Sequence, residues 1–290
     1  MGGCIVIRFK VTQKNNDKMK KAIRSGIVGA GFSANFHIES LRKVYGVHID
    51  IKGVYSPDYA EKFAEKHQIS TYQSLDALIE DVDVVHCCAI ASAHEPIALA
   101  VLKAGKSVII EKPFTGYFGD GTDAFNGQTF SKQTGLEKAM ESVQRMMNAE
   151  KKSEGKIYYA ENWVYAPSVQ KEIEILKKTE AQILWMHGEE SHSGSHSPAY
   201  GDWKLAGGGS AIGKGCHPLT AALKKKKMEG MFRNGKAIRP KSVSARMHNL
   251  TRLPGYLDQK HLRTDYKDVE DFAMMHIVFE DGTVADIYSC

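Results

Sequence analysis

The sequence of 290 residues lacks any apolar run near the roughly 18 residues that a membrane span requires. It also lacks a strong excess of one charge, because 39 basic residues are set against 34 acidic ones. Its five cysteines are odd in number and form no CxxC pair, which argues against a disulfide framework or a structural zinc site. We therefore expect a cytoplasmic protein that binds neither membrane nor nucleic acid.

The length predicts two domains. Residues 1–18 contain no patterned element, so we interpret them as an N-terminal extension. From residue 22 to residue 110, short apolar runs alternate with helical periods, which is typical of parallel strands joined by crossover helices. The expected strands are 23–28, 47–55, 83–88 and 107–110. The expected helices are 34–45, one after Ser56-Pro57 through His67, one capped by Ser74, and 93–104.

The pattern predicts an α/β fold whose first domain, 19–166, is a Rossmann doubly wound parallel sheet. Residues 115–134 interrupt it with glycines and aromatics but no periodicity, so we expect a long loop that covers the substrate cleft. Strands expected at 183–187, 242–247, 272–279 and 284–289 predict a second, α+β domain, 167–290, for substrate and oligomerisation. Its hairpin turn at 280–283 favours an open antiparallel sheet. Because the sequence stops inside a strand, we expect this sheet to be incomplete at the C-terminus.

A GxGxxA motif follows the first expected strand and opens the next helix. In this context Gly29 permits a tight turn, Gly31 lets a pyrophosphate approach the backbone, and Ala34 allows close helix packing. The alternative is a glycine-rich turn without a ligand. No acidic residue stands at the end of the second strand, where Tyr55 and Ser56 lie instead. We expect NAD as cofactor, with NADP left open.

Glu111-Lys112-Pro113 follows the strand 107–110 directly, at the carboxyl edge where doubly wound sheets bind their ligands. A lysine at this edge can donate a hydrogen bond to a substrate hydroxyl and stabilise the alkoxide. The alternative is a surface lysine paired with its neighbouring glutamate.

Together, the GxGxxA turn, Asp83-Val84-Val85 with His94, the segment 104–108 and Glu111-Lys112-Pro113 resemble the glucose-fructose oxidoreductase, inositol dehydrogenase and MocA family. The resemblance implies a nicotinamide-dependent enzyme that oxidises or reduces sugars or cyclitols, with Lys112 and the histidine of Gly215-Cys216-His217 as catalytic residues. It also favours a homo-oligomer formed through the C-terminal sheet. The expected cofactor contacts are Gly29, Gly31, Phe32, Ser33, Ala34, Tyr55, Ser56, Ala89, Ile90, His94, Glu111 and Lys112.

His217 precedes an expected helix at 218–223, whose N-terminal dipole would keep the imidazole neutral and available as a base. The alternative is a structural histidine. We interpret the lysine run 224–227 as a solvated helix end. Two positions depart from the family pattern: Gly213 replaces an aspartate, and Ala89-Ile90-Ala91 replaces Thr-Pro-Asn.

Four side chains are candidates for the carbohydrate substrate: Trp163, Tyr165, Trp203 and His196. Aromatic rings can stack on a sugar, although packing is the commoner role. His187, His192 and His196, beside Glu189 and Glu190, invite a metal site, but the intervening Ser and Gly residues favour a loop lining the cleft. We therefore expect no metal.

The sequence predicts an NAD(P)-dependent oxidoreductase that acts on the secondary hydroxyl of a sugar, glycoside or cyclitol. The long loop 115–134 favours an extended glycoside. The alternative is a non-catalytic dinucleotide-binding sensor or regulatory subunit of the same fold, which Gly213 favours and the pair Lys112 and His217 opposes.

Overall fold

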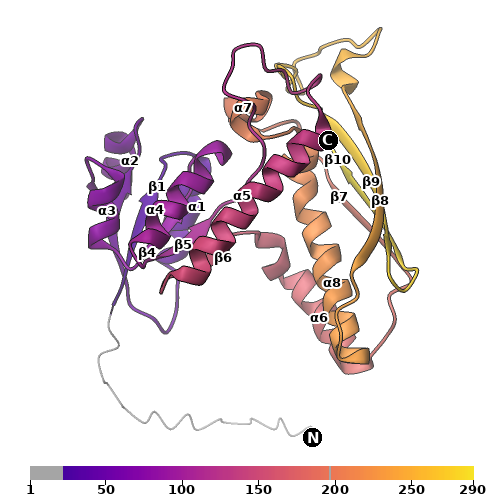
Figure 1. Cartoon of the computed structure of the whole chain (residues 1–290), viewed down its shortest axis with the longest axis horizontal. Coiled ribbons are helices and arrows are strands. Elements are labelled where there is room, and N and C mark those ends of the chain that lie inside the picture. The colour runs from indigo at the N-terminus through magenta and orange to yellow at the C-terminus, as the bar shows by residue number, and fades with distance from the viewer. Residues whose placement is uncertain (1–21, 196) are drawn as a thin grey trace, which may run out of the picture.

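Two sheets organise the chain in the computed structural model, which describes residues 22–195 and 197–290 (Figure 1). The proposed extension 1–18 and the candidate substrate residue His196 lie outside the described residues. The first sheet has six parallel strands in the order β3-β2-β1-β4-β5-β6, and the second has four in the order β7-β10-β9-β8. The order of the first sheet is that of a doubly wound Rossmann domain, so this prediction is confirmed.

The strands of the first sheet are β1 Ile23–Val28, β2 Ile49–Tyr55, β3 Ser70–Thr71, β4 Val84–Cys87, β5 Ser107–Ile110 and β6 Ile157–Tyr159. Its helices are α1 Phe32–Leu41, α2 Ala60–His67, α3 Leu75–Asp81, α4 His94–Lys103 and α5 Lys132–Lys152, with a short turn η1 Ala91–Ala93. Apolar side chains are buried on both faces of the sheet. Ile27 and Val54 pack with Ala34 and Ile38 of α1, whereas Val85 packs on the opposite face against α3, α4 and α5.

Two helix ends differ from the sequence predictions. Helix α1 ends at Leu41, because Val44 and Tyr45, which continue its apolar period, find no surface to cover and are 45% and 100% exposed. Helix α2 begins at Ala60 after Tyr59 in a left-handed conformation, so the Ser56-Pro57 start is wrong. The Ser74 cap is confirmed, since its hydroxyl accepts a hydrogen bond from the Ala77 N–H at 3.1 Å.

The second part of the chain places two long helices against one face of its sheet (Figure 1). Its helices and turns are η2 Asn162–Tyr165, α6 Pro167–Thr179, η3 Pro198–Gly201, α7 Trp203–Ala206, η4 Ala211–Gly215, α8 Cys216–Asn234 and η5 Leu250–Arg252. Its strands are β7 Trp185–Glu190, β8 Pro240–His248, β9 Phe272–Phe279 and β10 Val284–Ser289. Met186, Ile277 and Ile287 from the sheet pack with Ala222 of α8 and form the core.

This sheet is mixed rather than antiparallel. β8 pairs antiparallel with β9, and β9 pairs antiparallel with β10 through the expected hairpin. β7, however, runs parallel to β10, with Trp185 opposite Val284 and Glu190 opposite Ser289. No hairpin joins these two strands, because α7, α8, β8 and β9 lie between them in the chain, so turn signals could not fix their direction.

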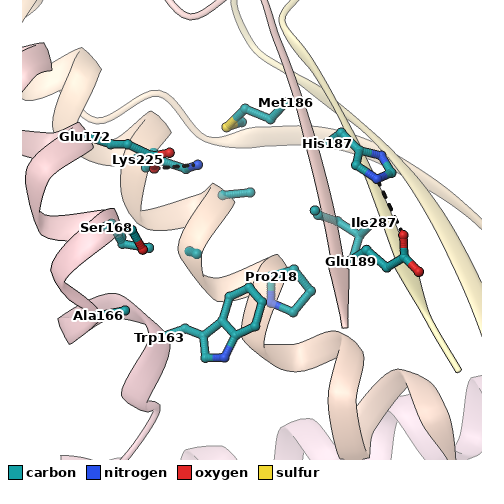
Figure 2. A pocket seen from close by; sticks show the side chains of 14 residues that line it. Trp163, Ala166, Ser168, Glu172, Met186, His187, Glu189, Pro218, Lys225 and Ile287 are labelled. Atoms are coloured by element: carbon teal, nitrogen blue, oxygen red, sulfur yellow. Dashed lines mark ion pairs between the residues drawn. The ribbon is translucent and has the colours of Figure 1, made fainter. Parts of the chain in front are cut away.

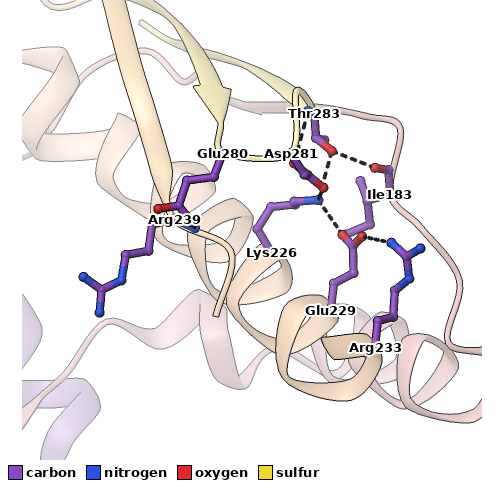
Figure 3. A network of polar contacts seen from close by, with 8 residues as sticks. All are labelled: Ile183, Lys226, Glu229, Arg233, Arg239, Glu280, Asp281 and Thr283. Atoms are coloured by element: carbon purple, nitrogen blue, oxygen red, sulfur yellow. Dashed lines mark hydrogen bonds and ion pairs between the residues drawn. The ribbon is translucent and has the colours of Figure 1, made fainter. Parts of the chain in front are cut away.

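The lysine run 224–227 is not a solvated helix end. Helix α8 continues to Asn234, and Lys226 is fully buried inside it. Its amino group donates hydrogen bonds to Glu229 at 2.6 Å, Asp281 at 2.8 Å and Thr283 at 2.9 Å (Figure 3). These contacts tie α8 to the turn between β9 and β10.

The long segment after β5 forms a loop as expected, and α5 begins at Lys132. Its aromatic rings pack on one another and on the second domain, with ring centroids of Phe130 and Trp203 5.0 Å apart. The Trp203 indole N–H donates to the Tyr117 carbonyl at 2.8 Å. The loop therefore connects the two sheets. Among the described residues, no helix combines the length and apolarity needed to cross a bilayer.

Candidate active site

The glycine-rich turn between β1 and α1 contains two glycines with different surroundings, a closely packed Gly29 and an accessible Gly31. Gly29 has φ +100°, and a Cβ there would lie 2.6 Å from the Cys88 carbonyl oxygen. Gly31 is exposed, and a Cβ built on it would meet no atom within 4 Å. The chain therefore needs glycine at position 29 for its own packing, whereas the open space over Gly31 fits the approach of a dinucleotide pyrophosphate.

The start of α1 completes this turn. Ala34 is fully buried against the sheet, as close helix packing requires. Phe32 is 67% exposed and Ser33 is half-buried beside it. Tyr55 closes β2 at the same edge of the sheet, and Ser56 follows it. The cofactor roles of these side chains remain predictions.

His94 joins two loops at the carboxyl edge of the sheet. Its ring is buried, with Nδ1 2.8 Å from the Pro113 carbonyl oxygen and Nε2 3.2 Å from that of Ala89. Burial lowers the pKa of His94. The histidine therefore holds Ala89, next to the exposed Ile90, against the turn that carries Lys112.

Glu111 is held by a chain of histidines that the sequence did not reveal. Its Oε1 lies 3.0 Å from His37 Nε2, and His37 Nδ1 lies 2.9 Å from His86 Nδ1. Its other oxygen accepts the Lys112 backbone N–H at 3.0 Å. Burial opposes ionisation, but the interactions with His37 and Lys112 together outweigh burial and lower the pKa of Glu111. Glu111 thus positions the backbone of Lys112.

Lys112 reaches from the first domain into the second. Its Nζ donates to the Gly213 carbonyl at 2.6 Å and to the Tyr200 hydroxyl at 3.4 Å. Burial opposes the charge on Lys112, but interactions with Tyr200 and Cys216 outweigh burial and raise the pKa of its amino group. The lysine therefore remains a cation and a hydrogen-bond donor at neutral pH.

Position 213, where the family pattern has an aspartate, leaves little room for a side chain. A Cβ on Gly213 would lie 3.2 Å from the Tyr200 ring, so a side chain there would crowd Tyr200. With glycine at this position, the backbone carbonyl of η4 receives Lys112 instead.

His217 lies between two carboxylates. Its Nδ1 is 2.7 Å from Glu161 Oε1, and its Nε2 is 3.9 Å from Glu190 Oε2. A carboxylate only accepts, so Nδ1 carries the proton and Nε2 keeps a free lone pair. The Trp163 ring stacks beside the imidazole, with centroids 5.9 Å apart and an interplanar angle of 17°. His217 is 7% exposed.

The expected helix-dipole explanation for His217 is wrong. The helical turn η4 runs directly into α8, so the backbone before His217 is already helical and presents no free helix N-terminus. The group that faces Nδ1 is the Glu161 carboxylate. This residue is 1% exposed, and its Oε1 also accepts the Trp163 backbone N–H at 3.0 Å.

Two further groups face this site. Burial raises the pKa of Glu190, although His217 and Lys112 oppose the shift. Burial also raises the pKa of Cys216, to about 12, so its thiol is neutral. Sequence analysis missed Glu161 and Cys216. The one signal for Glu161 was its place just after β6, at the edge where Lys112 follows β5.

Two cavities flank these residues. One, of about 320 Å³, lies between α6, α8 and β7, with Trp163 and Pro218 in its wall (Figure 2). The other, of about 690 Å³, is bounded by the long loop, α5 and Trp203, and by Ile212 next to Gly213. The Trp203 ring thus packs against the long loop. The Tyr165 side chain is 71% exposed. Their substrate roles remain predictions.

Residues 23–126 match a family described as oxidoreductases with an NAD-binding Rossmann fold, the Gfo/Idh/MocA family. Relatives similar to parts of this chain are named dehydrogenases. The match lies within the Rossmann domain. The predicted resemblance is confirmed.

Curated Gfo/Idh/MocA relatives align over part of their length. An inositol 2-dehydrogenase/D-chiro-inositol 3-dehydrogenase of Lactiplantibacillus plantarum is 37% identical over 94 residues, which are 30% of this chain and 27% of that protein. A trans-1,2-dihydrobenzene-1,2-diol dehydrogenase of Mus musculus is 29% identical over 195 residues, 65% of this chain and 52% of that protein. The chain therefore spans between about a quarter and a half of these relatives.

A solved structure extends the likeness in fold to both sheets. The structure of GenD2 from gentamicin A biosynthesis, in complex with NAD, covers 98% of this chain and 68% of its own chain, with a TM-score of 0.67 and 21% identity. At this identity the likeness concerns the fold. It supports a fold in which a Rossmann domain is followed by a second sheet.

Proposed function

We propose that the protein is an NAD(P)-dependent oxidoreductase that transfers hydride between a nicotinamide cofactor and the secondary hydroxyl of a sugar, glycoside or cyclitol. One observation carries this proposal. Lys112, a half-buried cation at the carboxyl edge of the first sheet, reaches η4 of the second domain, which leads directly to His217 with its unprotonated Nε2. A hydrogen-bond donor and a proton acceptor thus lie on connected elements near the sheet edge where a Rossmann domain presents its cofactor.

Each of these side chains has a separate role at the substrate hydroxyl. His217 Nε2 accepts the hydroxyl proton, because Glu161 holds the other proton on Nδ1 and stabilises the imidazolium that forms. Lys112 donates to the same oxygen and stabilises the developing alkoxide. Trp163 fixes the plane of the imidazole from one side. The nicotinamide, when bound, supplies the hydride acceptor or donor.

The residues present fit a dinucleotide. The space over Gly31 is open to phosphates, and α1 begins at Phe32 with N–H groups directed toward that space. No arginine stands beside Tyr55 and Ser56 to pair with a 2′-phosphate, which favours NAD over NADP.

The substrate class follows from the relatives and the aromatic walls. The aligned inositol dehydrogenase acts on a polyhydroxylated ring by name. Trp163, beside His217, offers such a ring an apolar face. The long loop, whose aromatic residues bound the larger cavity, favours an extended glycoside over a free monosaccharide.

Purified protein is mixed with NAD and a panel of sugars, glycosides and cyclitols while nicotinamide absorbance is followed. His217→Ala and Lys112→Met should each lower the chemical step by about 10² to 10⁴. The double variant should lose much less than the product of both effects, because the residues act on one hydroxyl. Cofactor binding without turnover across the panel would instead support the sensor alternative.

We further propose that the protein forms a homo-oligomer through its second sheet. All but one of the residues of the edge strand β8 are exposed, as expected for a strand that a second copy covers. Sedimentation of the intact chain tests this proposal, and a monomer at micromolar concentration would contradict it.

A further inference from the structure

Three side chains beside the proposed catalytic base carry the atoms that zinc-type cations prefer. The ligand atoms of Glu161, Cys216 and His217 all lie within 4.8 Å of one another. Across residues 22–195 and 197–290, no other group of three His, Cys, Asp or Glu side chains meets this spacing. A set of one oxygen, one sulfur and one nitrogen favours Zn²⁺ over Mg²⁺ or Ca²⁺, which take oxygen ligands.

A second observation points to a cation here. Glu161 is 1% exposed, and its Oε2 is buried without a hydrogen-bond partner. Glu190 Oε2, which lies 3.9 Å from His217 Nε2, is also buried and makes no hydrogen bond. A buried carboxylate oxygen without a partner is costly, and a bound cation would compensate it.

We propose that Glu161, Cys216 and His217 form a site for a divalent cation of the zinc class, and that the cation switches off proton acceptance by His217. The site itself stands on the cluster. Its effect on turnover rests on the proposed dehydrogenase function.

The charges of the site balance. One carboxylate and one thiolate compensate the two charges of the ion, and the imidazole binds as a neutral ligand. Three protein ligands leave a fourth, open position, as in catalytic zinc sites. Lys112 interacts with Cys216 and opposes a cation, and Lys214 interacts with Glu190, whose own charge favours a cation.

The geometry requires a small adjustment. Ligand atoms bound at about 2.0 to 2.3 Å in a tetrahedral site lie roughly 3.3 to 3.8 Å apart. Glu161 Oε1 is 2.7 Å from His217 Nδ1, so this carboxylate must withdraw slightly or rotate its unpartnered Oε2 toward the ion.

Metal binding reverses the tautomer that catalysis needs. The ion takes the electron pair of Nδ1, so the imidazole proton moves to Nε2, and the Cys216 proton leaves to water. An Nε2 that carries a proton cannot accept another from a substrate hydroxyl. The bound cation therefore inhibits the oxidation reversibly, without a change of fold.

The site is tested with Co²⁺, a spectroscopic probe for zinc sites, added to the full chain after treatment with a chelator. We expect a near-ultraviolet sulfur-to-cobalt charge-transfer band that is lost in Cys216→Ser and retained in the matched control Cys290→Ser. Glu161→Gln should weaken Co²⁺ binding at least tenfold, by the loss of a charged ligand. The absence of the band, or its survival in Cys216→Ser, would overturn the site.

Turnover then tests the switch separately. Zn²⁺ at concentrations that displace Co²⁺ from the site should abolish dehydrogenase activity, and a chelator should restore it. Activity that is unchanged or raised at full occupancy would overturn the switch but leave the site. If no substrate is oxidised, the proposed function fails, and the Co²⁺ spectra still decide the site.

Discussion

Glu161 Oε1 lies 2.7 Å from His217 Nδ1, and both side chains are buried. The two residues are 56 positions apart in the chain, and each comes from a different sheet system. A carboxylate that accepts a hydrogen bond from Nδ1–H keeps the proton on Nδ1 and leaves Nε2 as the only proton acceptor of the ring. We propose that this contact takes the place of the aspartate that the family pattern has at position 213.

Glu161→Gln should lower the turnover number by about 10²-fold, because an amide aligns the imidazole but does not stabilise its protonated form. The measurement is steady-state kinetics with a chelator present, together with calorimetry of NAD binding. Glu174→Gln, which removes an exposed carboxylate paired with Lys171 and Lys178, serves as the matched control. Equal turnover in the Glu161 and Glu174 variants would show that Glu161 does not position the base.

Gly31→Val should fold normally but bind NAD at least a hundredfold more weakly, since its side chain fills the space that the pyrophosphate needs. Gly29→Ala should instead destabilise the fold, because its Cβ would meet the Cys88 carbonyl and φ is +100°. Thermal melts and calorimetry of NAD binding separate the two effects. A folded Gly31→Val protein with normal NAD affinity would disprove the cofactor site.

Lys226→Met should lower the free energy of unfolding by about 3 to 5 kcal/mol, the cost of leaving a buried charge without its partner. Glu229, fully buried, would keep only Arg233, and Asp281 would lose the cation that ties the turn between β9 and β10 to α8. Urea denaturation measures the change. Lys227→Met, at an exposed position of the same run, should change stability by less than about 0.5 kcal/mol. A similar loss in both variants would rule out the buried network as the cause.

Stability should decline as the pH falls below 6.5. Burial, with a smaller effect of His37, lowers the pKa of His86 from 6.5 to about 3. Between pH 6.5 and pH 3, the unfolded chain therefore binds a proton at this histidine that the folded chain does not bind. The contribution of His86 to the free energy of unfolding is complete above pH 6.5 and falls by about 1.4 kcal/mol per pH unit toward pH 3.

His86→Leu should flatten this part of the stability profile, even if it lowers stability at neutral pH. Urea midpoints between pH 7.5 and roughly pH 4.5 measure the slope. His48→Leu, which removes an exposed histidine, should leave the slope as it is. A profile of His86→Leu as steep as that of the unaltered chain would contradict the assignment.

The sequence by itself determined the elements whose signals are local. The runs at 23–28, 107–110, 272–279 and 284–289 form strands with the predicted ends, because apolar runs, period-two alternation and the Gly282 turn are all written within a few residues. The turn at Gly29 and Gly31 could also be predicted, because the whole GxGxxA motif lies within a few residues between a strand and a helix.

Only the tertiary structure decided the contacts between distant segments. Composition could not show which lysine of the run 224–227 would be buried. The buried one, Lys226, donates a hydrogen bond to Asp281, which lies 55 positions later in the chain. It could not fix the direction of β7, whose partner β10 lies at the end of the chain. It could not place Glu161 beside His217, because the packing of α8 against η2 brings them together. Pairing across such separations depends on the whole fold, which carries no local signal.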